Sequence, residues 1–284
     1  MQNVLLRLRE VAPSLSSTER QIARYILANP NETTLLTIRQ LAQRTFSSPS
    51  SVVRVCRAIG FGGYKELRHA LTREIAALGE TGSHREQDIT PQDSLQEIVD
   101  KVTRNNIQCL QDTRQLLLLD QLEQCVDLVA QARTVLLFGI GSSLCVAKDT
   151  YLKFLRLDKP CVVNEDSHSQ LLQARNAKPE DVSIVFSYSG QTAEMIQCIR
   201  EMKANGVPVI AVTRYYPSEV AQLADHVLYV AANESLFRNG AMSSRLSQLN
   251  VMDILYTAYA SRNYEDTLRR LTRTHITKDG AEPR

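Results

Sequence analysis

Apolar residues recur at helical spacing in the first part of the chain, between short polar breaks. A helix start at 16–19 leads into a periodic stretch that stops at Pro30. A short helix opens at 37–42, and Ser48 with the proline after it starts another, which runs to Gly60. Two short helices joined by a tight turn, with small polar residues at the start of the second, predict a helix-turn-helix.

Later in the chain, short apolar runs alternate with helical segments, which is typical of an α/β doubly wound parallel sheet. Between the two patterns, a polar stretch follows the helix that ends near Leu78. We therefore expect an all-α helix-turn-helix bundle over 1–79, a linker over 80–92 and an α/β domain over 93–284. The strands are expected at 134–138, 161–163, 182–186, 207–212 and 227–230.

The strand expected at 182–186 runs into a loop that carries two serines, a glycine and a threonine before the next helix. Such a turn gathers hydroxyls and backbone N–H groups at the positive end of a helix dipole, where a phosphate group binds well. The loop has no lysine or arginine, which disfavours the P-loop of a nucleotide triphosphatase. The candidate ligand-binding residues of this loop are Ser187, Ser189, Gly190, Gln191 and Thr192.

A second loop of the same kind follows the strand expected at 134–138. If the two strands are parallel neighbours, both loops lie at one crevice, because ligands in open α/β sheets bind beyond the carboxyl ends of the strands. Serine-rich and glycine-rich turns also follow strands in many α/β proteins without binding a ligand, and this alternative stays open. The candidate residues here are Gly141, Ser142 and Ser143.

The net charge of +2 conceals an asymmetry between the two parts of the chain. Residues 1–79 hold eleven basic and five acidic side chains, whereas the other 205 residues hold 22 basic and 26 acidic ones. A basic first part indicates a polyanionic partner for that part alone.

Composition and the remaining patterns exclude several other classes of protein. A chain that is 43% hydrophobic and 23% charged is ordinary for a globular protein. No apolar run approaches ~20 residues and the first residues do not resemble a secretion signal, so we expect a cytoplasmic protein that does not bind membranes. The six cysteines are scattered, without C-x-x-C pairs or nearby histidines, and are expected to be reduced core thiols. We expect no metal and no cofactor.

The two loops resemble those of the SIS (sugar isomerase) domain family. Its phosphosugar loop, S-x-S-G-x-T, begins here at Ser187, and its first loop, G-x-G-x-S, begins at Gly139. In that family these hydroxyls and turn amides hold the phosphate of a sugar phosphate, and the resemblance implies the same for this chain. His168 and Glu234 lie in segments that also follow the family pattern, and each is a candidate to hold a sugar hydroxyl.

The first part of the chain resembles the helix-turn-helix domain of the RpiR-type regulators. The pattern S-x-x-E-[RK]-x-I-A begins at Ser16, and S-x-x-[ST]-V-V-R-x-C-[RK] begins at Ser48. The resemblance implies that the helix starting at Ser48 approaches the major groove of double-stranded DNA. The candidate DNA-binding residues are Ser48, Pro49, Ser50, Ser51, Arg54, Arg57, Lys65 and Arg68.

The turn of this motif departs from the family pattern. It usually reads Gly-Val before the serine, whereas here it reads Phe46-Ser47, so a glycine suited to positive φ and an apolar plug are both missing. Either Phe46 becomes the plug of a reshaped turn, or the turn is weaker than usual.

Three functions are compatible with parts of this sequence. A nicotinamide or flavin binder would explain the first loop, but Leu144 stands where G-x-G-x-x-G requires its third glycine. A sugar-phosphate isomerase shares the SIS fold and would use a carboxylate or histidine such as Glu234 or His168 as its base, but it has no use for a basic helix-turn-helix.

The interpretation that uses both parts of the chain is a transcriptional regulator, expected to be a repressor and not an enzyme, whose effector is a phosphorylated sugar. Since a single helix-turn-helix covers little DNA, we expect a homodimer or homotetramer that reads an inverted repeat.

Overall fold

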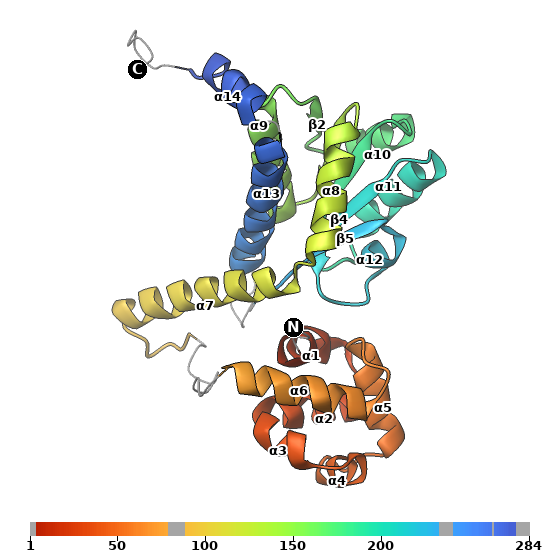
Figure 1. The fold of residues 1–284 in the computed structure, drawn as a ribbon, viewed down its shortest axis with the longest axis vertical. Helices are drawn as coiled ribbons and strands as arrows, with labels where there is room; N and C mark the ends of the chain where they lie inside the picture. The colour runs from red at the N-terminus through yellow and green to blue at the C-terminus, as the bar shows by residue number, and fades with distance from the viewer. Residues whose placement is uncertain (1–3, 79–88, 233–240, 263, 277–284) are drawn as a thin grey trace. The chain divides into compact units, whose positions relative to one another are not determined.

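The computed structural model of the chain describes residues 4–78, 89–232, 241–262 and 264–276 (Figure 1). They form two compact units, which are described separately below. The first comprises residues 1–116 together with 215–217, and the second comprises 117–214 together with 218–284.

The first unit contains a bundle of short helices around one apolar core (Figure 1). Ile22, Leu41 and Val52, from three different helices, are fully buried at its centre. Two of these helices were not expected from the sequence, α1 and α3; α2 ends before Pro30 as expected, and Pro30 then opens α3, where a missing N–H is harmless. The helices are α1 (Val4–Val11), α2 (Ser17–Ala28), α3 (Pro30–Leu35), α4 (Ile38–Arg44), α5 (Pro49–Ala58) and α6 (Tyr64–Leu78).

Helices α4 and α5 and the turn between them form the expected helix-turn-helix. Thr37 caps α4 in a reciprocal arrangement with Gln40, and the Ser48 side chain caps α5 by accepting a hydrogen bond of 3.1 Å from the Ser51 N–H group. These caps satisfy N–H groups that have no partner within a helix. They therefore fix where each helix of the motif begins.

The turn between α4 and α5 forms without the usual glycine and apolar residue. Thr45 is buried, and its hydroxyl donates to the Leu41 carbonyl at 2.8 Å. Phe46 instead adopts a φ of +47° and leaves its side chain 89% exposed. Phe46 therefore occupies the conformation that suits the missing glycine, and it is not the plug of the turn.

The second unit is built on a five-stranded parallel sheet in the order β2-β1-β3-β4-β5 (Figure 1). Its strands form nearly continuous apolar runs because helices cover both faces. The strands are β1 (Val135–Gly139), β2 (Cys161–Val163), β3 (Val182–Phe186), β4 (Val209–Arg214) and β5 (His226–Val230). The expected doubly wound parallel sheet is thus confirmed.

Alternate residues of each strand point to opposite faces of the sheet. Val135 and Leu137 face the core shared with α8, α9 and α13, whereas Leu136 and Phe138 face the core shared with α10, α11 and α12. The helices of the first face are α8 (Leu119–Gln131), α9 (Ser142–Arg156) and α13 (Met242–Arg262). Those of the second are α10 (Ser167–Asn176), α11 (Ala193–Ala204) and α12 (Glu219–Leu223).

Helix α13 buries apolar residues such as Met252 and Leu255 in its second half, but its first half buries polar ones. Leu246 and Leu249 are only partly buried, whereas Ser247 and Gln248 are fully buried. The first half of α13 therefore turns small and polar side chains toward the sheet. Two further helices are α7 (Leu95–Leu116), which belongs to the first unit, and α14 (Tyr264–Arg273), which belongs to the second and was not expected.

Candidate functional site

The two serine-containing loops follow neighbouring strands of the sheet. Strand β1 pairs in parallel with β3, with Gly139 opposite Phe186. The chain reverses its direction of winding between these strands, since β2 lies on one side of β1 and β3 on the other. Ligands of open α/β sheets bind at such a switch point. The structure thus brings the two predicted loops together at the carboxyl ends of these strands.

The loop after β3 presents hydroxyls at three depths. Ser187 is buried, Thr192 is partly buried, and their hydroxyl oxygens lie 3.1 Å apart. Ser189 is exposed, and its Oγ accepts a hydrogen bond of 3.2 Å from the N–H group of Gln191, which is also exposed. The Ser189 hydroxyl proton therefore remains able to donate to a ligand.

Gly190 at the centre of this loop has no room for a side chain. Its φ is +65°, and a Cβ atom built there would lie 2.1 Å from Ser218 Oγ and 3.0 Å from Thr213 Oγ1. Its carbonyl accepts a hydrogen bond of 3.2 Å from the Val220 N–H group. Glycine is thus required both by the conformation and by the close approach of the segment before α12.

The loop after β1 places Gly141 and two serines at the start of α9. Gly141 has a φ of +59°. Ser142 and Ser143 form the first turn of α9, and Ser143 Oγ lies 3.4 Å from Oε1 of the buried Gln248. Gln248 thus links this loop to α13, a role that the sequence analysis did not assign.

A second buried glutamine, Gln170 of α10, holds the end of β1. Its Oε1 accepts from the Gly139 N–H group at 3.1 Å, while its Nε2 donates to the Gly139 carbonyl at 3.0 Å and to the Asn164 carbonyl at 3.1 Å. Gln170 was not among the predicted site residues, because a polar residue within a helix carries no local sign that it is buried. It fixes the backbone from which the first loop departs.

The helices that follow the two loops lack side-chain caps. No side-chain hydrogen bond caps α9 at Gly141 or α11 at Thr192, whereas Asp166 caps α10 and Ser218 caps α12. The N-termini of α9 and α11 lie at the switch point, whereas α8, which also lacks a side-chain cap, follows neither loop. Their dipoles and first N–H groups favour an anion there.

Two further residues, His168 and Glu234, were predicted to contact the sugar. His168 lies in the first turn of α10, where it is exposed and where Asp166 Oδ1 accepts from the Ser169 N–H group at 2.8 Å. Asp166 therefore caps this helix, and His168 does not. Glu234 lies outside the residues that the structure describes.

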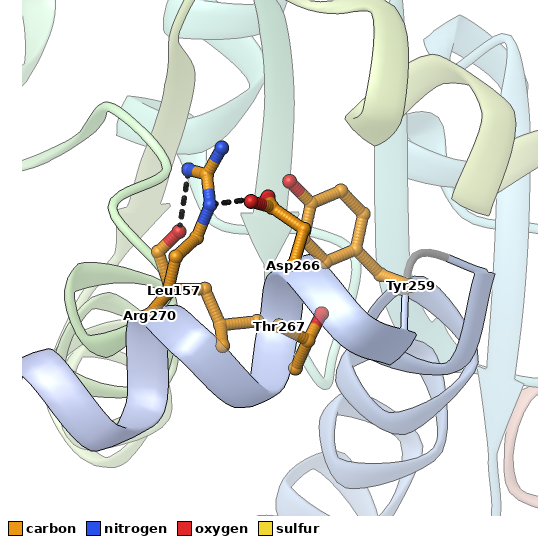
Figure 2. A pocket seen from close by; sticks show the side chains of 5 residues that line it. All are labelled: Leu157, Tyr259, Asp266, Thr267 and Arg270. Carbon is orange, nitrogen blue, oxygen red and sulfur yellow. Dashed lines mark hydrogen bonds and ion pairs between the residues drawn. The ribbon is translucent and has the colours of Figure 1, made fainter.

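A small cavity of about 70 Å³ lies at the far end of α9. Figure 2 shows that Arg270 crosses it, with Nε 2.6 Å from Asp266 Oδ2 and Nη1 donating to the Leu157 carbonyl at 2.9 Å. Since α9 spans 15 residues, its two ends are separated by roughly 22 Å. The cavity is thus remote from the loops, and Arg270 fixes α14 to the carboxyl end of α9 there.

In the first unit, the start of α5 presents three of the predicted DNA-binding residues at the surface. Ser48, Pro49 and Ser50 are exposed. Ser51 is buried, so its hydroxyl supports the motif from within: it lies 3.0 Å from Ser48 Oγ and accepts from Arg54 Nη2 at 3.0 Å.

Arg54 joins α5 to α2. Its Nε donates to Glu19 Oε1 at 2.8 Å, while 60% of the side chain remains exposed. This hydrogen bond, together with the one from Ser16, lowers the pKa of Glu19 below its ordinary value of 4.5. Arg54 can therefore position the start of α5 and still reach a phosphate group with its remaining N–H donors.

The other predicted DNA-binding residues carry positive charge around α5. Arg57 and Lys65 are exposed, and Arg68 is partly buried, with Nη1 3.5 Å from the Leu36 carbonyl. Between Ile38 and Phe61 the sequence holds four arginines and no acidic residue. This segment therefore attracts polyanions.

The cysteines and the possible metal-ligating side chains were also compared with the predictions. All six cysteines are free thiols, and burial raises the pKa of Cys56, Cys125 and Cys161 to about 12. Cys145 is exposed, which differs from the general expectation of core thiols. In the parts of the chain that the structure describes, no cluster of three metal-ligating side chains is found, and no helix is long and apolar enough to cross a membrane.

Comparison with known proteins matches both parts of the chain. Residues 2–78 match the helix-turn-helix domain of the rpiR family, and residues 128–258 match the SIS domain. An uncharacterized HTH-type transcriptional regulator of Caldanaerobacter subterraneus is 36% identical over 96% of both chains.

Solved structures agree with this comparison. The Vibrio vulnificus NanR protein complexed with ManNAc-6P is 28% identical, covers 96% of both chains and has a TM-score of 0.59. A putative sugar-phosphate isomerase from Listeria monocytogenes is 19% identical, covers 62% of this chain and 98% of its own, and has a TM-score of 0.55, which shows a shared fold alone.

Proposed function

This chain belongs to the RpiR family of helix-turn-helix transcriptional regulators with a SIS domain, and on that premise we propose that a phosphorylated sugar controls its binding to DNA. The observation that carries the proposal is the meeting of two hydroxyl-bearing loops, each followed by an uncapped helix, at the β1/β3 switch point. Such a site selects a phosphate group through neutral donors and helix dipoles.

The phosphate is proposed to bind the hydroxyls and turn amides of both loops. The binding residues are Gly141, Ser142, Ser143, Ser187, Ser189, Gly190, Gln191 and Thr192. His168 and Glu234 are proposed to contact sugar hydroxyls. The NanR relative is described as a complex with ManNAc-6P, which makes phosphorylated amino sugars the first compounds to test on this chain.

DNA binding is proposed for the exposed start of α5 and the basic side chains near it. Ser48, Pro49 and Ser50 approach the major groove, while Arg54, Arg57, Lys65 and Arg68 hold phosphates or bases and Ser51 supports Arg54. The regulator is proposed to act as a repressor on an inverted repeat, as a homodimer or homotetramer. Residues 1–79 then form the DNA-binding domain, 80–92 the linker and 93–284 the effector-binding and oligomerisation domain.

The proposal is tested by titrating the full-length protein with an array of phosphorylated sugars and following binding by calorimetry. One or a few sugar phosphates should bind, while the same sugars without phosphate should not. Failure of every phosphorylated sugar to bind would contradict the proposed effector class.

The same array separates a regulator from a sugar-phosphate isomerase, because the SIS fold is shared by both. Each bound sugar phosphate is incubated with the protein and the mixture is analysed for the isomeric product. We expect binding without turnover. Turnover that is lost with the loop hydroxyls would favour the isomerase instead.

A further inference from the structure

The folded protein alone does not explain why a phenylalanine, rather than a glycine, occupies position 46 in the turn of the helix-turn-helix. A non-glycine residue at positive φ costs about 1–2 kcal/mol, and Phe46 holds a φ of +47°. The residue is 89% exposed, so its side chain also lacks the stabilisation that burial would give. Such strain at a surface aromatic residue indicates a contact made in a complex.

The position and charge of the surroundings identify the partner. Phe46 stands two residues before Ser48, the N-cap of α5, so its Cα lies within about 7 Å of the residue that begins the recognition helix. The segment from Ile38 to Phe61 carries four arginines and no acidic residue. Arg44 and Arg54 pair with Glu32 and Glu19 of neighbouring helices, which leaves the charges of Arg39 and Arg57 without an ion pair among the described residues. A surface of this charge favours duplex DNA over a second copy of the same surface, which it would repel.

Resting on the proposed DNA-binding function, we propose that the Phe46 ring contacts the 5-methyl group of a thymine in the major groove and so helps to select the operator sequence. The N-terminal residues of a recognition helix lie against base edges in that groove. Thymine is the base that offers an apolar group there, and phenylalanine is among the side chains that contact it. Phe46 thus supplies the apolar base contact at the turn, beside the polar contacts of Ser48 and Ser50.

The experiment removes the methyl group without changing any hydrogen bond. Duplexes bound by the full-length protein are selected from a random-sequence pool, and each thymine of one half-site is then replaced by uracil. We expect one replacement to weaken binding about fourfold, the effect of one buried methyl group. Phe46→Gly should bind the original duplex correspondingly more weakly and should not respond to that replacement.

Phe46→Gly is expected to fold at least as well as the unmodified protein, because glycine adopts positive φ without strain. Leu35→Ala, at a residue of α3 that is 82% exposed, serves as the control and should keep the thymine response. Equal responses of the unmodified protein and Phe46→Gly at every thymine would overturn the inference about Phe46 while leaving DNA binding intact. A protein that enriches no sequence from the pool would contradict both this inference and the proposed function.

Discussion

Gln170 holds the backbone of Gly139 by both of its polar groups: its Oε1 accepts from the Gly139 N–H group at 3.1 Å and its Nε2 donates to the Gly139 carbonyl at 3.0 Å. Both residues are buried. One side chain of α10 therefore fixes the point at which the chain leaves β1 for the first loop. Since an unpaired buried polar group costs about 1–3 kcal/mol, this contact is important to the local stability of the site.

Gln170→Leu should destabilise the end of β1 locally. It keeps the approximate volume of the side chain but leaves buried Gly139 without these two partners. We expect the free energy of opening at the Gly139 amide, measured by native-state hydrogen exchange, to fall by about 2–3 kcal/mol. Gln197→Ala, at an exposed position of α11, should change it by less than about 0.5 kcal/mol. Unchanged exchange in Gln170→Leu would show that this hydrogen-bond pair contributes little.

Gly190→Ala should damage the phosphate loop more than an ordinary glycine replacement. The added Cβ would lie 2.1 Å from Ser218 Oγ and 2.5 Å from Ser218 Cβ, at a φ of +65°. Gly206 has a similar φ of +74°, but its nearest neighbour, Pro179 Cγ, would lie 3.8 Å away. Gly206→Ala therefore carries the conformational strain without the clash.

We expect Gly206→Ala to lose about 1–2 kcal/mol of stability and to keep sugar-phosphate binding. Gly190→Ala should lose more stability and should also lose binding, as measured by thermal unfolding and calorimetry. If both variants lost the same stability and both still bound the ligand, the close approach between the loop and the segment before α12 would be unimportant.

The ion pair between Glu19 and Arg54 predicts a pH effect in the first unit. The Arg54 hydrogen bond and then the Ser16 hydroxyl lower the pKa of Glu19 from 4.5. Its ionised form thus stabilises the folded state above about pH 4.5, and this contribution is lost as the pH falls through the lowered value.

Arg54→Met should raise the pKa of Glu19 toward its ordinary value, as followed by carbon-13 NMR of the side-chain carboxyl group. Glu97, whose pKa is lowered by hydrogen bonds from the Ser94 backbone and hydroxyl, provides the control and should not move. A Glu19 pKa that stays the same in the variant would argue that Arg54 is free to leave Glu19 when it binds DNA.

Local patterns predicted much of this structure. Ser16, Thr37 and Ser48 each cap the helix that the sequence predicts to begin there, and such caps depend only on neighbouring residues. The strands were recognisable because they are buried on both faces and so form apolar runs. The pairing of β1 with β3, on which the site depends, then follows from the doubly wound topology.

The elements that escaped prediction depend on contacts between distant residues. Gln170 and Gln248 are polar residues in helices, and nothing local shows that they are buried against loops many residues away. Helix α14 has apolar residues at helical spacing, Tyr264, Leu268 and Leu271, but buries none of its described residues, and polar bonds such as that from Arg270 to Leu157 hold it instead. At Phe46, the sequence pattern was compatible with either a reshaped turn that buries the ring or a weaker turn.

The loop after β3 is proposed to sense a sugar phosphate and thereby to change DNA binding elsewhere in the chain. If the exposed Ser189 hydroxyl donates to the phosphate, that charge-assisted hydrogen bond is worth about 1.5–3 kcal/mol, or roughly 10-fold to 150-fold in affinity. Ser189→Asp should lose more, because it places an anion against the phosphate in a loop without lysine or arginine.

The most direct measurement is DNA binding by the full-length protein, titrated with the tightest-binding sugar phosphate of the array. The unmodified protein and Ser261→Asp, which adds the same charge at an exposed position near the end of α13, should both respond to the ligand. Ser189→Asp should bind DNA equally well without ligand and should lose the response, since a ligand shifts an equilibrium only by its differential affinity for two states. A Ser189→Asp protein that responds at the same ligand concentration as the unmodified protein would contradict the account.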